Sequence, residues 1–556
     1  MLRPSTSWIP ACVLAIVAGA SVAETPDAGA ELGELIRAAG EIRVETQSAE
    51  EFDAAAEAYR DLLDRLEAVD REELGDDDSI DAELLEAHAR TRLFEIEELR
   101  LHELVPVRYL ALFRTSSLFL RPCGAGGRQI RQAIEELERL PEVLANGRAN
   151  LSRPAREWTD NAIYTASYAR GLLRDDVPDL CTDDAELKRR IEEAAGPALE
   201  ALDDFESWMR NELLPRSTRS PAWKVEEIDF YQRVHEGLVD YDSRRMLEIA
   251  LDEERRVLDE MTALAGRIHP SGDLATVWNL MKDETPPWSE VRAMAERYVR
   301  LADDWLQGPG AYLVEIPEAF DYGVEITSPM GRRILSFGGA SYGPTIAGRI
   351  SGYYVLTPLE EQLTEEERAS RLRSYNPYWT HVISYHEWLG HNVERAIGNE
   401  HVRRPMRKLF RSSYLSQAWS FYLEKLLEDE GYFEVLPHVE ALKTRMARLQ
   451  MRMWRVQRIV TKISMALGTM SFEEAVEAYV EKIGMEPTNA YIEVQRDCQS
   501  PSPPGREIIG EMVILEMRDA YAKRMGPHYR IRNFHTALLR YGELPLPTVR
   551  RLMLGD

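Results

Sequence analysis

Residues 384–394 read Ser-Tyr-His-Glu-Trp-Leu-Gly-His-Asn-Val-Glu, with one histidine at position 386 and a second at position 391. In zinc peptidases two histidines of one helix hold the metal, and the glutamate after the first histidine polarises the metal-bound water. Their usual spacing is four residues, whereas His386 and His391 are five apart, about 140° around a regular helix. A π-bulge or a break at Gly390 would return both rings to one side. We therefore predict an interrupted helix; the alternative is two helical histidines with unrelated partners.

The size and charge of the chain limit its architecture and its partners. Its 556 residues suffice for two or three domains, or for one large helical domain. The net charge of −27 argues against nucleic acid and against docking on an anionic membrane surface. Such a charge mainly favours solubility, and a cationic peptide is a further alternative.

The first 23 residues have the pattern of a signal peptide. Arg3 precedes an apolar run over residues 8–20, and Ser21-Val22-Ala23 is a small-x-small cleavage site. An uncleaved anchor is the alternative, although the run is short for a membrane span. No cysteine directly follows the cleavage site, which argues against a lipid anchor there. We predict an exported protein, periplasmic or secreted, without an integral membrane segment after cleavage.

Three cysteines remain beyond the signal peptide: Cys123, Cys181 and Cys498. The chain has no Cys-x-x-Cys, so a cysteine metal site is not expected. In an oxidising compartment a disulfide between Cys123 and Cys181, the nearest pair in sequence, is a reasonable prediction.

The apolar periodicity predicts a mainly α fold. Residues 24–214 form a helical N-terminal region, in which Asp76-Asp77-Asp78 is interpreted as a charged turn. A Ser-, Pro- and Arg-rich joint at 215–221 precedes a second helical region over 225–556, and the two regions are also compatible with one continuous domain.

Residues 311–358 differ from the rest because glycine and aromatic residues become frequent, as in Gly352-Tyr353-Tyr354. The short β-prone runs predict a sheet of two or three strands. Such a sheet often borders a cleft and binds extended peptide by strand addition, with Tyr353 and Tyr354 as candidate contacts. The alternative is a structural hairpin.

An arginine series marks the long helix predicted over residues 437–467. Its members are Arg445, Arg448, Arg452, Arg455 and Arg458. A solvated face is the default interpretation, and the lining of an anion-accepting cleft is the alternative.

The C-terminal half resembles a known family in several segments. They are Glu493-Val494-Gln495-Arg496, Gly510-Glu511, Leu515-Glu516-Met517-Arg518 and residues 534–547 (Phe-His-Thr-Ala-Leu-Leu-Arg-Tyr-Gly-Glu-Leu-Pro-Leu-Pro). In this order they resemble the C-terminal signature of family 885 of the domains of unknown function. Its members are mostly helical, often exported bacterial proteins that are regarded as zinc metallopeptidases. Upstream, residues 417–424 resemble its E-G-W-A-L-Y-A-E segment, and residues 386–394 resemble its H-E-A-x-P-G-H-H-x-Q segment.

The chain departs from that family at several motif positions. The metal segment lacks the family's Pro before Gly390, and Gln417 replaces the Glu of E-G-W. Lys462 and Ala466 stand where the family has Asp and His, and Glu507 replaces a Tyr. The loss of the carboxylate at position 417 has a candidate compensation. Glu394, three residues after His391, provides a carboxylate where the family has Gln.

The resemblance implies a predominantly α enzyme, a large multi-helix body with a small β-element beside a central cleft. His386 and His391 would bind Zn²⁺, with Glu394 as the third ligand. Gln417 and Glu424 are alternative ligands or ligand supports. Glu387 would be the general base. Arg496 would hold a substrate carboxylate or pair with a neighbouring helix. The leading hypothesis is an exported zinc peptidase; the alternative is a degenerate member that serves as a binding or scaffold protein.

Overall fold

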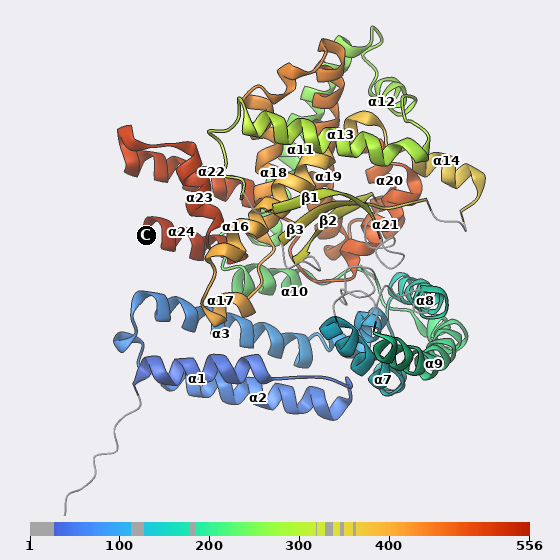
Figure 1. Ribbon diagram of the computed structural model, residues 1–556, viewed down its shortest axis with the longest axis vertical. Coiled ribbons are helices and arrows are strands. Elements are labelled where there is room, and N and C mark those ends of the chain that lie inside the picture. The colour runs from blue at the N-terminus through green and yellow to red at the C-terminus, as the bar shows by residue number, and fades with distance from the viewer. Residues whose placement is uncertain are drawn as a thin grey trace, which may run out of the picture.

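The computed structural model describes residues 27–112, 127–176, 184–317, 320–327, 337–344, 350–359 and 363–555. Helices make up about three quarters of this part of the chain, and one small sheet lies among them (Figure 1). The predicted mainly α fold with a small β-element is confirmed. The predicted signal peptide and the cysteines 123 and 181 lie outside the described residues.

The N-terminal layer consists of three long helices, α1 (Ala28–Glu41), α2 (Ala49–Ala68) and α3 (Asp76–Glu97). Asp27 and Ser48 cap the first two helices, since their side chains accept hydrogen bonds from the backbone N–H groups of residues 29 and 51. The prediction of a charged turn at Asp76–Asp78 is wrong. These residues form the first turn of α3, where the helix dipole stabilises negative charge.

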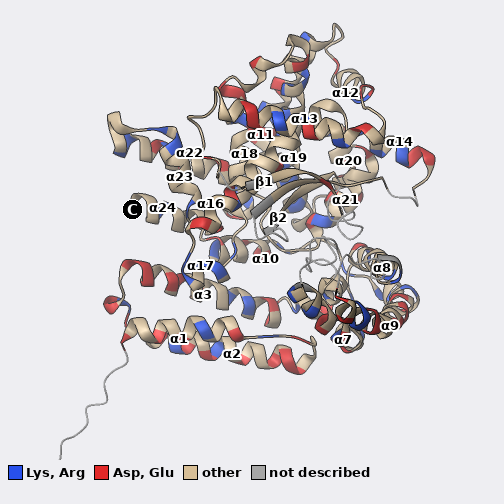
Figure 2. Cartoon of the chain, viewed as in Figure 1, with Lys and Arg blue, Asp and Glu red and all other residues tan. Residues whose placement is uncertain are grey.

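Helix α17 (Pro405–Leu409) lies beside α3 and holds the N-terminal layer on the body (Figure 2). Arg404 and Arg407 form ion pairs with the buried carboxylate of Asp81, at 2.5 and 3.0 Å. They also pair with Asp78 and Asp77. The acidic start of α3 therefore docks on residues more than 300 positions later, which a local pattern does not encode.

A second bundle lies beside the first and has its own core. It contains α4 (Leu101–Leu104), η2 (Pro106–Leu110), α7 (Gly127–Asn150), α8 (Arg156–Gly171), η4 (Leu172–Asp176), α9 (Ala185–Trp208), η5 (Met209–Leu213) and η6 (Leu214–Arg216). Its apolar core runs from Leu99 to Tyr231, while α1 to α3 share a larger core with the chain from Leu238 onward. The joint expected at 215–221 is therefore not a boundary between hydrophobic cores.

The body is built around the long helices α11 (Ser243–Ile268) and α19 (His438–Ala466), which pack along each other. The helices before the sheet are α10 (Val225–Phe230), η7 (Tyr231–His235), α12 (Leu274–Lys282) and α13 (Trp288–Gln307). Those after it are α14 (Glu365–Arg373), α15 (Pro377–Tyr385), η9 (His386–Val393), α16 (Glu394–His401), α18 (Tyr414–Asp429) and η10 (Tyr432–Val435). The chain ends with α20 (Phe472–Ile483), α21 (Pro487–Cys498), α22 (Ile508–Met525), η11 (Gly526–His528), α23 (Ile531–Leu539) and α24 (Leu546–Leu554).

The sheet has three strands, β1 (Phe320–Ile326), β2 (Gly338–Pro344) and β3 (Ile350–Leu356), in the order β1-β3-β2. β3 is parallel to β1 and antiparallel to β2, with Gly338 opposite Leu356. Both β2 and β3 contact the segment 386–393. Edge strand β2 therefore lies beside the histidines that the sequence singled out.

None of the helices within the described ranges combines the length and the apolar character that a membrane crossing requires.

Candidate active site

The segment with the two histidines is a π-helix. Helix α15 begins at Pro377 behind an Asn376 cap and ends at Tyr385, and η9 then runs from His386 to Val393 with π geometry. The predicted departure from a regular α-helix is confirmed, although it begins at His386 rather than at Gly390. Because π-helices bond residue i to i+5, they place residues five apart on the same side. The two imidazole centroids accordingly lie 5.0 Å apart.

Gly390 allows η9 to pack directly against α18. A Cβ atom at this position would lie 2.4 Å from Ser420 Oγ, 2.6 Å from its Cβ and 2.9 Å from its Cα. Any larger residue would separate the two helices, so the glycine fixes the distance between the histidines and the side chains of α18.

Each histidine is oriented by a partner on α18. His386 Nδ1 lies 2.8 Å from Glu424 Oε1, and His391 Nδ1 lies 3.0 Å from Ser416 Oγ. With Nδ1 engaged, Nε2 of each ring is the nitrogen left for a ligand. Burial lowers the pKa of both histidines well below the usual value, so both rings are neutral, as metal binding requires.

A pocket of about 220 Å³ brings the candidate residues together. Its walls include His386, Glu387, His391 and Gln417, together with residues 338–340 of edge strand β2. Burial raises the pKa of Glu387 to about 7, and Arg455 opposes that rise. A carboxylate with such a pKa exchanges protons readily near neutrality.

The spacing of the two imidazoles suits a metal ion, whereas the other pocket residues provide few further ligands. Two histidines on a tetrahedral zinc, each with Zn–N of about 2.1 Å, have ring centroids about 5 Å apart, close to the distance found here. Within the described ranges, however, no third His, Cys, Asp or Glu joins them in a cluster that could hold a metal. The pocket instead offers the amide of Gln417.

The structure does not bring Glu394 into this pocket. Its carboxylate lines a separate cavity of about 550 Å³. Burial raises the pKa of Glu394 to about 7, while Arg395 and the Ser416 hydroxyl oppose that rise. Glu424 supports His386 through a hydrogen bond, which matches the ligand-support alternative of the sequence interpretation. Burial also raises its pKa to about 7.

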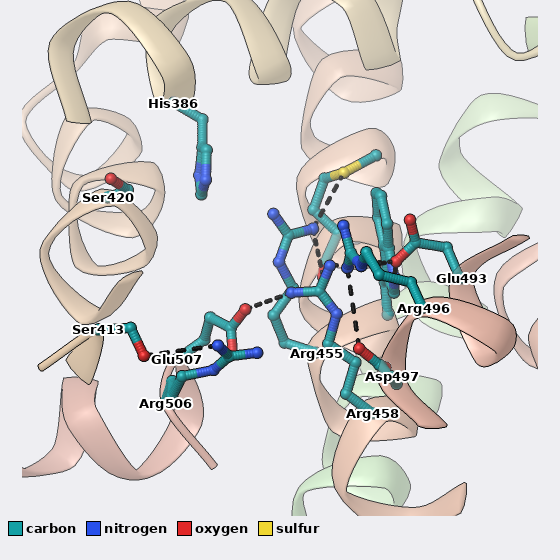
Figure 3. A network of polar contacts seen from close by, with 12 residues as sticks. His386, Ser413, Ser420, Arg455, Arg458, Glu493, Arg496, Asp497, Arg506 and Glu507 are labelled. Atoms are coloured by element: carbon teal, nitrogen blue, oxygen red, sulfur yellow. Dashed lines mark hydrogen bonds and ion pairs between the residues drawn. The ribbon is translucent and has the colours of Figure 1, made fainter. Parts of the chain in front are cut away.

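The default interpretation of the arginine series as a solvated face is wrong. Arg448, Arg455 and Arg458 are buried, at 3%, 6% and 7% exposure. Figure 3 shows His386 pointing from its helix toward the arginine cluster below it. Arg458 forms ion pairs with Glu507 and with Glu493, the latter at 3.1 Å. Arg455 forms a looser ion pair, with Glu424 at 3.9 Å.

The family departures are integrated into the structure as polar contacts. The Lys462 ammonium donates to the backbone carbonyls of Asp497, Ser500 and Ser502 at 2.9, 2.8 and 2.8 Å. Burial lowers the pKa of Lys462 to about 8. Glu507, which replaces a tyrosine, accepts from Arg458. Ala466 ends α19 and packs against the second core without a polar group.

The candidate substrate residues have different positions. Tyr354 is buried at 1% exposure in central strand β3, and the pocket walls include neither Tyr353 nor Tyr354. Arg496 lines the pocket and also forms an ion pair with Glu493 at 2.7 Å. Sequence reasoning missed Ser416 and residues 338–340. The position of Ser416, one residue before the E-G-W-like segment, was the only sequence signal for it.

The family comparison agrees with the C-terminal motifs. Bacterial proteins of unknown function of the DUF885 family match this chain over residues 26–553. The chain belongs to the DUF885 family. No curated protein matches it.

Two solved structures share the fold of this DUF885 member. A “putative lipoprotein of unknown function” from Shewanella oneidensis is 17% identical, with a TM-score of 0.70, and the match covers 94% of this chain and 97% of the other. A “putative lipoprotein” from Colwellia psychrerythraea is 14% identical, with a TM-score of 0.72, and the match covers 94% and 96%. At these identities the likeness shows the fold alone.

Proposed function

We propose that this chain is an exported, metal-dependent hydrolase that cleaves peptide bonds in the pocket beside β2. The observation that carries the proposal is the π-helix, which turns His386 and His391 toward one pocket beside Glu387. Export is supported by the signal-peptide pattern of residues 1–23 and by the likeness to proteins described as lipoproteins.

His386 and His391 would hold the metal, and the Gln417 amide oxygen would be the third protein donor. A divalent ion such as Zn²⁺ would supply Lewis acidity and lower the pKa of a bound water. Glu387 accepts the proton of the attacking water and then passes it to the leaving amine. The C–N bond breaks, the acyl carbon gains the hydroxyl and the amine gains the proton.

The other pocket residues have roles that follow from their position. Among the described strands β2 pairs only with β3, so an extended peptide can add along its other edge at Gly338 to Ala340. The buried Arg455 guanidinium supplies positive charge where the carbonyl oxygen becomes negative. Glu424 and Ser416 keep the two imidazoles in place.

The metal content of the purified protein tests this proposal. We expect about one equivalent of Zn²⁺, which His386→Ala removes together with peptide hydrolysis. The exposed histidine at the start of α19 provides a matched control, His438→Ala, which should leave both unchanged. Glu387→Gln should keep the metal and lower the rate on the order of 10²–10⁴-fold. Wild-type protein that takes up no metal and cleaves no member of a broad peptide library would refute the proposal.

A second candidate function is peptide binding without hydrolysis. It is favoured by Gln417, because the neutral amide replaces the carboxylate of the family segment that this stretch resembles. Gln417→Glu separates the two functions. If the wild-type protein is a hydrolase, it already binds metal with a measurable affinity, and Gln417→Glu binds the metal more tightly. If the chain only binds peptides, the wild type lacks metal and Gln417→Glu acquires it.

A further inference from the structure

A second cavity borders the candidate active site, and five of its lining residues are cations. It measures about 520 Å³ and shares Gln417, Arg458 and Arg496 with the pocket around the histidines. We call it the basic cavity. Its charged lining residues are Arg108, Arg458, Lys462, Arg496 and Arg506, against Glu95 and Asp497. A local excess of positive charge in a chain of net charge −27 indicates a site for an anion.

Three of the five cations have their hydrogen bonds committed to other groups of the protein. Arg458 and Arg496 form ion pairs with Glu493, and Arg458 also pairs with Glu507. Lys462 is held by three backbone carbonyls. Lys462 adds positive charge to the cavity wall, but the hydrogen bonds of all three groups are committed.

Arg108 and Arg506 are the two cations with free hydrogen-bonding capacity. Within the described ranges, neither guanidinium forms an ion pair, although the charge of Arg108 acts on Glu95 and that of Arg506 acts on Glu507. The Arg506 guanidinium has a long contact of 3.4 Å to Ser413 Oγ. Arg506 Nε is buried without a hydrogen-bond partner in the same part of the chain. A guanidinium is a planar donor whose shape matches a carboxylate.

The position of the basic cavity identifies the end of the peptide that would bind there. The basic cavity shares one wall with the pocket in which the peptide bond would be cleaved. An anionic group bound in the basic cavity would therefore lie a short distance from that bond. An extended peptide on β2 that reaches into this cavity would end there on its α-carboxylate.

We propose that the basic cavity binds the free C-terminal carboxylate of a peptide substrate, so that the enzyme releases short C-terminal fragments. This inference rests on the proposed function, because it assigns the substrate class of the same site. Arg108 and Arg506 are the binding residues, and Lys462 adds positive charge to the cavity wall.

Direct binding to full-length Glu387→Gln protein tests the inference without requiring turnover. The probes are tetra-alanine with a free C-terminus, tetra-alanine amide, and a C-terminally amidated tetrapeptide with glutamate as its last residue, measured by calorimetry. We expect the free acid to bind about 10- to 100-fold more tightly than the amide. Adding Arg108→Gln and Arg506→Gln should abolish this preference, whereas the control Arg255→Gln, an exposed arginine of α11, should keep it.

Equal affinity for free acid and amide would overturn the inference, as would equal binding of the amidated glutamate peptide, which would assign the cavity to acidic side chains. A preference that survives the double substitution would also overturn it, provided that circular dichroism shows the variant folded. The proposed function is tested separately by metal content and hydrolysis. Cleavage without a C-terminal preference refutes only this inference, and a preference without cleavage refutes only the hydrolase.

Discussion

Gly390→Ala tests whether the contact between η9 and α18 determines the site. The added Cβ would meet three atoms of Ser420 at 2.4, 2.6 and 2.9 Å, and the last of these is the backbone Cα. Ordinary carbon contacts are about 3.5–4.0 Å, so the two helices must separate by roughly 1 Å. Overpacking of this kind costs about 1–3 kcal/mol.

The same displacement should weaken the metal site. Helix α18 carries Ser416, Gln417 and Glu424, so its displacement lengthens the 2.8 and 3.0 Å contacts that orient both imidazoles. Loss of such supporting contacts typically costs 10- to 100-fold in metal affinity. We therefore expect a free energy of unfolding lower by about 1–3 kcal/mol in urea denaturation. Zinc competition titration should show affinity lower by about 10- to 100-fold.

A second substitution on α18 provides the internal control. Ser420→Gly removes the two atoms nearest the new methyl group but leaves Cα at 2.9 Å, so it should rescue Gly390→Ala in part. Alone, Ser420→Gly should cost about 0.5 kcal/mol through helix propensity. Additive effects in the double variant, or a Gly390→Ala protein with unchanged stability and zinc affinity, would refute the reasoning.

Three further predictions concern buried charges. The raised pKa of Glu394 means that the native state holds this proton more tightly than the unfolded chain. The free energy of unfolding should therefore fall as pH rises from about 4.5 to about 7, and Glu394 should account for up to about 3 kcal/mol of this decrease. The decrease should be smaller by that amount in Glu394→Gln, as measured by urea denaturation at both pH values. Lys462→Met should cost about 2–4 kcal/mol because three carbonyls lose a donor, and Lys462→Asp should cost more. The exposed control Lys523→Met should leave the urea midpoint unchanged, and an equal midpoint for Lys462→Met would contradict the structure. Arg458→Met should cost about 3–5 kcal/mol because it leaves the buried Glu507 without its ion-pair partner. Arg455→Met, which loses only the looser 3.9 Å pair, should cost less, and the reverse order of melting temperatures would count against this assignment.

Local sequence patterns predicted those features of the molecule that depend on neighbouring residues. Apolar periodicity predicted the helices, and glycine-rich, β-prone runs predicted the sheet. The five-residue spacing of His386 and His391 predicted a departure from the α-helix, because only another helical pitch places both rings on one side. The C-terminal segments predicted the family.

Only the tertiary structure decided which charges are buried and which groups meet. The sequence of α19 places its arginines four or fewer residues apart, but it does not contain the carboxylates of Glu493 and Glu507 that allow Arg458 to be buried. The acidic start of α3 reads as a solvated turn until Arg404 and Arg407 arrive from α17. Ser416 and Glu424 orient histidines that lie 25 and 38 residues earlier in the chain. Periodicity reports the face of a helix, whereas burial of a charge depends on a partner that the fold brings from a distant part of the sequence.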